Sequence, residues 1–233
     1  MKLGLLLADQ LAPELTHRYE HYSDVFVSYF TRYVCKSLEY TNYDLKNGEL
    51  PSCPEECDAY LITGSKNSVY EDLPWITSLL SFIRSTFERS VPLVGFCFGH
   101  QAIAQALGGK VRLAERGWRV GLQNYDLVHP VPWAPDSRKC FQLLATHKDQ
   151  VYQLPPDAIH FACGVDSNFA GYYIDQRVLA LQSHPEFDPD VLQIILETRK
   201  DELGVKYEEA KLSMQKKADR EYIGRVIRQF LDI

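Results

Sequence analysis

The chain has 233 residues, of which 45% are hydrophobic and 24% are charged, and its formal net charge is −6. This composition is ordinary for a globular protein with a large core, and an acidic chain without a basic stripe argues against a nucleic-acid partner. No segment approaches the roughly 20 apolar residues that span a bilayer, so we expect no membrane segment.

The chain opens with the apolar stretch Met1–Ala8, which is followed at once by Asp9 and Gln10. This stretch is too short for a signal peptide and lacks a small-x-small cleavage pattern. We therefore predict a buried strand over Lys2–Leu7. With no export signal, we expect a cytoplasmic protein with free thiols.

Apolar strand-like runs then alternate with helical stretches, a pattern typical of doubly wound α/β proteins. The predicted strands are Lys2–Leu7, Val34–Tyr40, Ala59–Thr63, Leu93–Phe96 and Val178–Ser183, and the predicted helices are Asp24–Phe30, Trp75–Phe87, Gln101–Leu107 and Pro189–Leu203. Continuous apolar strands favour a parallel sheet covered on both faces. We expect a three-layer α/β/α domain with a mostly parallel, flavodoxin-like sheet.

The region from Val111 to Ala180 is richer in β-forming residues and turns, which predicts a small antiparallel extension of the same domain. No linker or repeat interrupts residues 1–233, so we expect a single domain. The end of the chain, about 207–233, carries apolar residues at helical spacing. This pattern favours a helix packed on the sheet, with a partner-binding helix as the alternative.

The residues Gly95-Phe96-Cys97-Phe98-Gly99 lie between the strand Leu93–Phe96 and the helix Gln101–Leu107. Glycines on both sides of one reactive residue, at a strand-to-helix turn, are typical of a nucleophile elbow. A helix N-terminus favours the thiolate, which is the nucleophilic form of cysteine. The alternative, a buried structural cysteine, is less favoured by this context.

The other cysteines offer no comparable pattern. The chain holds Cys35, Cys53, Cys57, Cys97, Cys140 and Cys163. Only Cys53 and Cys57 are close in sequence, and no second pair lies nearby. We therefore expect no metal site.

A cysteine nucleophile needs a base, and the base needs a group that orients it. His184 and Glu186 follow an apolar strand and are two residues apart, so in extended backbone both point to the same face. Glu186 is then placed to bond one imidazole nitrogen and leave the other for the thiol. Taken alone, His-Pro-Glu would read as a surface turn.

Together these motifs resemble the class I (triad) glutamine amidotransferases. Three further segments fit that family: Leu61–Tyr70 resembles its oxyanion strand and turn, Ala145–Val151 its Ser-His-x-Asp-x-Val segment, and Gly117–Gly121 its Gly-x-x-Val-Gly. The stretch from Thr63 to Ile76 is most similar to the free-standing, GMP-synthase-like subgroup that includes γ-glutamyl peptidases. Two positions depart from the family pattern. The oxyanion turn reads Gly64-Ser65-Lys66 where many members have Gly-Gly-Pro, and Ser183 precedes the histidine.

The resemblance implies roles for particular residues. Cys97, His184 and Glu186 would be catalytic, and the backbone N–H groups of Ser65 and Phe98 would form the oxyanion hole. Gly64, Gln101 and His147 would bind the substrate, although Gln101 and His147 are equally consistent with structural roles. Asp149 would support the pocket loop or cap a helix. The implied chemistry needs no cofactor.

Three functions remain open from the sequence. The first is a glutaminase subunit that supplies ammonia to a separate synthetase. The second is a free-standing hydrolase of γ-glutamyl compounds. The third is a catalytically silent binding protein, which the complete set of Cys97, His184 and Glu186 disfavours. A cysteine α/β-hydrolase is disfavoured because that fold expects the acid to precede the histidine.

Overall fold

The computed structural model describes all residues from Met1 to Ile233. Its main sheet has nine strands in the order β2-β1-β3-β4-β11-β10-β9-β6-β7. The strands are β1 (Lys2–Leu7), β2 (Glu39–Asp44), β3 (Ala59–Ile62), β4 (Leu93–Phe96), β6 (Arg119–Leu127), β7 (Cys140–His147), β9 (Ile159–Gly164), β10 (Ser167–Ile174) and β11 (Val178–Leu181). A separate ribbon pairs β5 (Lys110–Leu113) with β8 (Asp149–Gln153).

The sheet changes character at β11. The strands β2, β1, β3, β4 and β11 run parallel, whereas β10, β9, β6 and β7 continue it in antiparallel fashion. The inner parallel strands β1, β3, β4 and β11 are apolar because helices cover both of their faces. The expected flavodoxin-like α/β/α fold with an antiparallel extension is confirmed, and the extension is nearly as wide as the parallel part.

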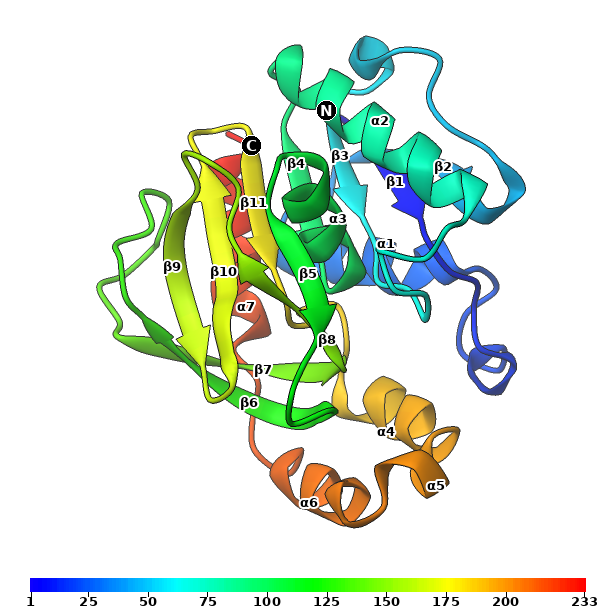
Figure 1. Ribbon diagram of the computed structural model, residues 1–233, viewed down its shortest axis with the longest axis vertical. Helices are drawn as coiled ribbons and strands as arrows, with labels where there is room; N and C mark the ends of the chain where they lie inside the picture. The colour runs from blue at the N-terminus through cyan, green and yellow to red at the C-terminus, as the bar shows by residue number, and fades with distance from the viewer.

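The helices lie on both sides of the sheet and beyond one end of it (Figure 1). They are α1 (Tyr22–Tyr33), α2 (Pro74–Glu88), α3 (Phe98–Ala106), α4 (Pro189–Glu197), α5 (Lys200–Leu203), α6 (Val205–Ser213) and α7 (Arg220–Phe230), with short 3-10 turns at Pro13–Leu15, Leu45–Asn47 and Pro54–Glu56. Helices α1 and α7 cover one face, and α2 and α3 cover the other. Helices α4 to α6 lie past the carboxyl ends of the parallel strands (Figure 1).

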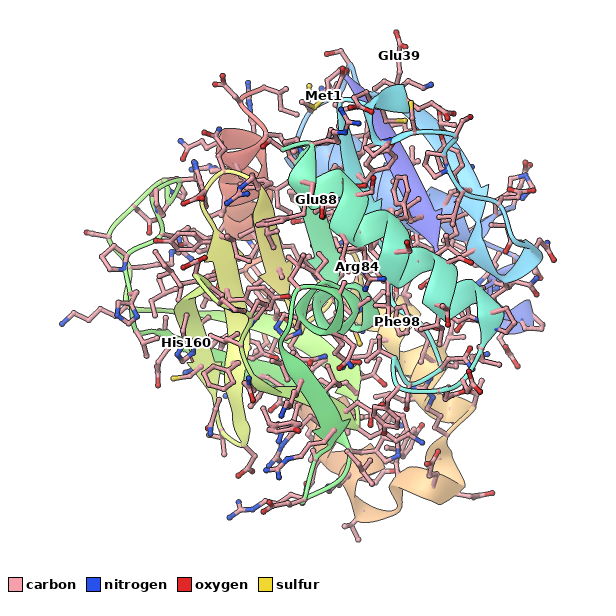
Figure 2. All side chains as sticks on the ribbon, turned by 45° about the horizontal axis from the view of Figure 1, so that its top comes forward. Met1, Glu39, Arg84, Glu88, Phe98 and His160 are labelled. Carbon is pink, nitrogen blue, oxygen red and sulfur yellow. The ribbon has the colours of Figure 1, made fainter.

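Two hydrophobic clusters, one on each face of the sheet, form the core. A cluster of 39 buried residues includes the inner faces of α1 and α7, and one of 24 residues includes α2 and α3. Figure 2 shows α2 lying across the sheet with Arg84 and Glu88 along it, and both of these residues are exposed. The charged side of the helix therefore faces solvent and its apolar side the core.

Three predicted elements differ from the structure, the third of them at the end of the chain. The strand predicted over Val34–Tyr40 is wrong, because α1 continues to Tyr33 and β2 starts only at Glu39. An edge strand pairs on one side only, so β2 is polar and gives no apolar run, whereas Val34 and Leu38 are apolar because their connection packs in the core. The helix predicted over Pro189–Leu203 is divided into α4 and α5.

The C-terminal stretch contains two helices, α6 and α7, instead of one. Between them, the Asp219 N–H donates to the Gln142 carbonyl at 2.7 Å, and the Gln142 N–H donates to the Asp219 carboxylate at 2.8 Å. Gln142 belongs to β7, the edge strand of the sheet. The helical segment is therefore interrupted where Asp219 pairs with the edge strand β7. After this interruption, the apolar side of α7 packs against α1.

Candidate active site

Cys97 lies at the tight turn between β4 and α3, with φ +52° and ψ −102°. The two flanking glycines are required by close packing. A Cβ on Gly95 would come within 2.7 Å of the Gly99 backbone, and one on Gly99 within 2.2 Å of the Ile62 carbonyl oxygen. Because α3 approaches β3 and β4 this closely, neither position accepts a side chain without a backbone shift.

The Cys97 side chain is 6% exposed and lies at the N-terminus of α3. Gln182 Nε2 donates a hydrogen bond to Cys97 Sγ at 3.7 Å. The amide of Gln182 is held in turn by Gln101 Nε2, which donates to Gln182 Oε1 at 3.2 Å. Sequence reasoning missed Gln182, whose one signal is its position two residues before His184.

His184 and Glu186 lie beside Cys97 in the turn that follows β11. His184 Nδ1 is 2.6 Å from Glu186 Oε1, and the His184 ring stacks on Phe187 with centroids 4.2 Å apart. The His184 N–H also donates to the Leu144 carbonyl at 2.8 Å. These contacts fix both the position and the orientation of the imidazole.

Burial lowers the pKa of His184, but the nearby Glu186 carboxylate and the Cys97 thiolate outweigh it and raise that pKa to about 10. Glu186 is itself buried, and its Oε2 has no hydrogen-bond partner within the protein. An opposite charge close to a buried ionisable group favours the charged form. The arrangement therefore favours the protonated form of the His184 imidazole.

Arg220, the first residue of α7, binds the backbone of the turn that carries His184 and Glu186. Arg220 Nε donates to the Pro185 carbonyl at 2.9 Å, and Arg220 Nη2 donates to the Glu186 carbonyl at 3.0 Å. The guanidinium also lies over the rings of Tyr29 and Tyr33. The C-terminal helix therefore positions the loop that carries His184 and Glu186, a contact that no local sequence pattern indicated.

Gly64 and Ser65 lie beside Cys97 at the end of β3. A Cβ on Gly64 would sit 3.0 Å from His184 Cε1 and 3.8 Å from Cys97 Cβ. Tyr22 Oη donates to the Gly64 carbonyl at 3.2 Å, which orients this peptide, while the Ser65 N–H has no partner within the protein. At the start of α3, the Phe98 N–H is one of the free donors of a helix N-terminus. The Phe98 ring packs on Trp75 of α2, with ring centroids 5.5 Å apart.

Asp149 fixes the loop that follows Ser65. Its carboxylate accepts hydrogen bonds from the Ser68 hydroxyl and from Tyr70 Oη. Its backbone carbonyl accepts from Gln101 Nε2 at 3.0 Å and bonds His147 Nδ1 at 3.0 Å. Of the two roles considered for Asp149, the structure places it in support of the pocket loop.

His147 and Gln101 both line a depression beside Cys97, together with Phe98 and Asp149. Burial lowers the pKa of His147 to about 4, and the positive charge of His184 contributes to that shift. Because Nδ1 of the neutral ring is engaged by the Asp149 carbonyl, Nε2 remains as an acceptor. Both hydrogens of the Gln101 amide are already used by Asp149 and Gln182, which leaves its oxygen free.

No group of three or more histidine, cysteine, aspartate or glutamate side chains could hold a metal ion. None of the helices combines the length and the apolar character that crossing a bilayer requires.

Known proteins share this fold and sequence pattern. The model of the family "Glutamine amidotransferase class-I" matches residues 19–197. Gamma-glutamyl peptidase 4 of Arabidopsis thaliana is 28% identical over 224 residues, covering 91% of this chain and 88% of the relative. Gamma-glutamyl peptidase 5 of the same plant is 28% identical over 203 residues, covering 84% of this chain and 80% of the relative.

Solved structures show the same architecture. A glutamine amidotransferase from Thermotoga maritima has a TM-score of 0.76 at 20% identity, covering 99% of this chain and 96% of that one. One from Methylobacillus flagellatus has a TM-score of 0.76 at 18% identity, covering 99% and 92%. The family model spans most of the chain and agrees with the resemblance in the motifs. The chain therefore belongs to the class I glutamine amidotransferase family.

Proposed function

We propose that the protein hydrolyses the γ-amide bond of a γ-glutamyl compound through a thioester on Cys97. The observation that carries the proposal is the geometry around the elbow. Cys97 and the buried imidazole of His184 line the same hollow, and His184 Nδ1 is 2.6 Å from the buried Glu186 carboxylate. Covalent acyl transfer uses this arrangement, in which a nucleophile contacts a base and the base is oriented by an acid.

In the first step, the Cys97 thiolate attacks the γ-carbonyl carbon and forms a carbon–sulfur bond. The developing oxyanion is held by the N–H groups of Ser65 and Phe98, and each such donor typically lowers the barrier by ~3 kcal/mol. The carbon–nitrogen bond then breaks as His184 gives its proton to the leaving nitrogen. Glu186 keeps the imidazole in the required tautomer.

In the second step, His184 takes a proton from water while the water oxygen attacks the thioester. The carbon–sulfur bond breaks, glutamate leaves, and the thiolate and imidazolium are restored. Gln182 supports the thiolate with its hydrogen bond to Sγ. The cycle uses only side chains and backbone of this chain and needs no cofactor.

The γ-glutamyl group is assigned to the depression lined by Gln101 and His147. His147 Nε2 and Gln101 Oε1 are acceptors suited to the α-ammonium of the substrate. Gly64, which has no side chain to block the approach to Cys97, borders the path of the scissile bond. The names of the Arabidopsis relatives support γ-glutamyl peptides as substrates, and glutamine is the smaller alternative.

The test is glutamate release by the purified protein from glutamine and, separately, from γ-glutamyl dipeptides, with Cys97→Ala as the control. We expect turnover of dipeptides by the protein alone and its loss in Cys97→Ala. Turnover confined to glutamine would favour the alternative of a glutaminase that serves a separate synthetase. The absence of Cys97-dependent turnover on every substrate would contradict the proposed function.

A further inference from the structure

Building on this proposed function, we infer that the cleft on the His184 side of Cys97 is a leaving-group site. It fits an amino acid with an apolar side chain, and Arg199 binds the carboxylate of that leaving group. The inference concerns which γ-glutamyl compounds the protein cleaves, and it assigns a role to a residue beyond the span that the family model matches.

Two hollows meet at Cys97 and differ in their linings. The first includes His184, Gly64 and Phe187, whereas the second includes Phe98, Gln101 and His147. Both share Ser65, Lys66, Cys97, Thr146 and Arg199.

His184 delivers the proton to the leaving nitrogen and lines only the first hollow. The leaving group must therefore lie in that hollow when the γ-glutamyl group occupies the second.

The leaving-group cleft has an apolar wall. Its apolar lining comes from Ala12, Leu15, Val25, Phe187, Val191 and Ile195, which belong to the N-terminal turn, to α1 and to the region of α4. The N-terminal turn is tied to α4 by an ion pair between Arg18 and Asp188. Ammonia released from glutamine is too small and too polar to use this wall, whereas an apolar side chain gains free energy by covering it.

Arg199 lies where the two hollows meet and has no acidic partner. Its one side-chain hydrogen bond is donated by Nη1 to Thr146 Oγ1 at 2.9 Å, and its guanidinium lies over the Trp118 ring at 4.8 Å. Burial lowers its pKa, yet an arginine remains charged in proteins. The acid of this cleft, Asp9, is already engaged by Lys46 and by the Lys66 N–H, each at 2.8 Å.

The position of Arg199 suits the carboxylate of an α-amino acid. In a γ-glutamyl dipeptide the α-carbon is bonded to the leaving nitrogen, and the carboxylate follows directly. That carboxylate therefore lies close to Cys97, at the junction of the two hollows, while the side chain extends along the apolar wall. Arginine is well suited to bind a carboxylate through two hydrogen bonds.

A matched pair of substrates tests the role of Arg199. γ-Glutamyl-phenylalanine and γ-glutamyl-phenethylamine share the apolar group, but only the first carries a carboxylate on the leaving group. We expect Arg199→Gln to lower kcat/KM for the dipeptide by about tenfold or more, the size of a lost charged hydrogen bond, and to change the amide and glutamine much less. Arg199→Lys, which keeps the charge, should retain more dipeptide activity than Arg199→Gln.

The apolar wall is tested with two neighbouring isoleucines of similar partial exposure. Ile195 lines the cleft and Ile194 does not. Ile195→Ala should lower kcat/KM for γ-glutamyl-phenylalanine by about tenfold relative to γ-glutamyl-glycine, whereas Ile194→Ala should leave that ratio unchanged.

Equal losses on dipeptide, amide and glutamine in Arg199→Gln would overturn the inference, as would a wild-type kcat/KM that does not rise with leaving-group size. Both results still include Cys97-dependent glutamate release. A protein that releases no glutamate from any of these substrates would instead contradict the proposed function itself.

Discussion

The backbone of Cys97 adopts a positive φ that residues with a Cβ rarely take. Such conformations cost of order 1–3 kcal/mol and persist where the surrounding structure enforces them. Here the close packing of Gly95 and Gly99 against their neighbours holds the turn. The strain has a chemical purpose, because it lifts the thiol above the sheet toward His184.

This strain predicts a stability difference between two inactive variants. Cys97→Gly removes the Cβ, whereas Cys97→Ala retains it. Because the strained conformation costs ~1–3 kcal/mol and the added flexibility of an unfolded glycine only ~0.4–1 kcal/mol, Cys97→Gly should be the more stable variant by about 1 kcal/mol. Denaturant unfolding measures the difference. An alanine variant as stable as the glycine variant would show that the elbow is not strained.

The pair of His184 and Glu186 predicts a pH dependence. In the proposed mechanism His184 acts as an acid while it is protonated. Burial lowers its pKa, but Glu186 and Cys97 outweigh burial and raise that pKa to about 10. Activity should therefore persist into alkaline solution and fall as the pH rises through that value. Glu186→Gln removes the carboxylate charge that raises the pKa of His184. The alkaline limb of kcat/KM should therefore move to lower pH.

A pH–rate profile from about pH 6 to pH 11 for both proteins measures this shift. The same pKa has a consequence for stability: a pKa raised on folding stabilises the protein below the unfolded value near 6.5, and this contribution is lost as the pH approaches 10. An alkaline limb in the same place in wild type and Glu186→Gln would show that Glu186 does not set the protonation of His184.

At the scale of elements, α7 supports the site from the opposite end of the chain. Arg220 donates to the carbonyls of Pro185 and Glu186. Arg220→Gln should lower kcat by about tenfold, because a small misplacement of a catalytic group is costly, with a moderate loss of stability. A steady-state assay and a thermal melt together separate the two effects.

The matched control is Arg225→Gln on the same helix. The Arg225 side chain is 59% exposed and pairs only with Glu221, and exposed ion pairs contribute little to stability. This variant should behave as wild type in both measurements. If Arg220→Gln also behaves as wild type, the turn at Pro185 does not depend on α7.

Elements with local signals were predictable, and long-range contacts were not. The buried parallel strands have a distinctive apolar sequence because both of their faces are covered. The elbow has one because close packing requires glycine on both sides of Cys97. The sequence misplaces the edge strand β2 because its polar residues resemble those of a loop. Arg199 and Arg220 reach the site through the folding of distant segments, and no spacing in the sequence indicates such contacts. Gln182 lies two residues before His184, but this position alone does not indicate a contact with Cys97.

For the whole molecule, the central question is how far the C-terminal segment belongs to the core. The apolar side of α7 is formed by Tyr222, Ile223, Val226, Ile227 and Phe230, each no more than 5% exposed. Burying such side chains contributes ~1.5–3 kcal/mol each, or about 8–15 kcal/mol together. This is comparable with the entire free energy of unfolding of a typical domain, ~5–15 kcal/mol.

A chain that ends at Gly204 should therefore fail to fold, since it lacks α6 and α7 and exposes the face of the sheet next to α1. Circular dichroism and near-ultraviolet spectra of the truncated and full-length proteins measure this. A truncated chain with native spectra and a cooperative melt would mean that the α1 face of the core is stable without α7.

The account as a whole depends on a covalent γ-glutamyl intermediate at Cys97, and partitioning with hydroxylamine tests this most directly. Hydroxylamine competes with water for the thioester and yields γ-glutamyl hydroxamate beside glutamate. If every substrate passes through the same thioester, the ratio of hydroxamate to glutamate should be identical for substrates with different leaving groups, and both products should disappear in Cys97→Ala. A ratio that varies with the leaving group, or undiminished hydrolysis in Cys97→Ala, would contradict the mechanism.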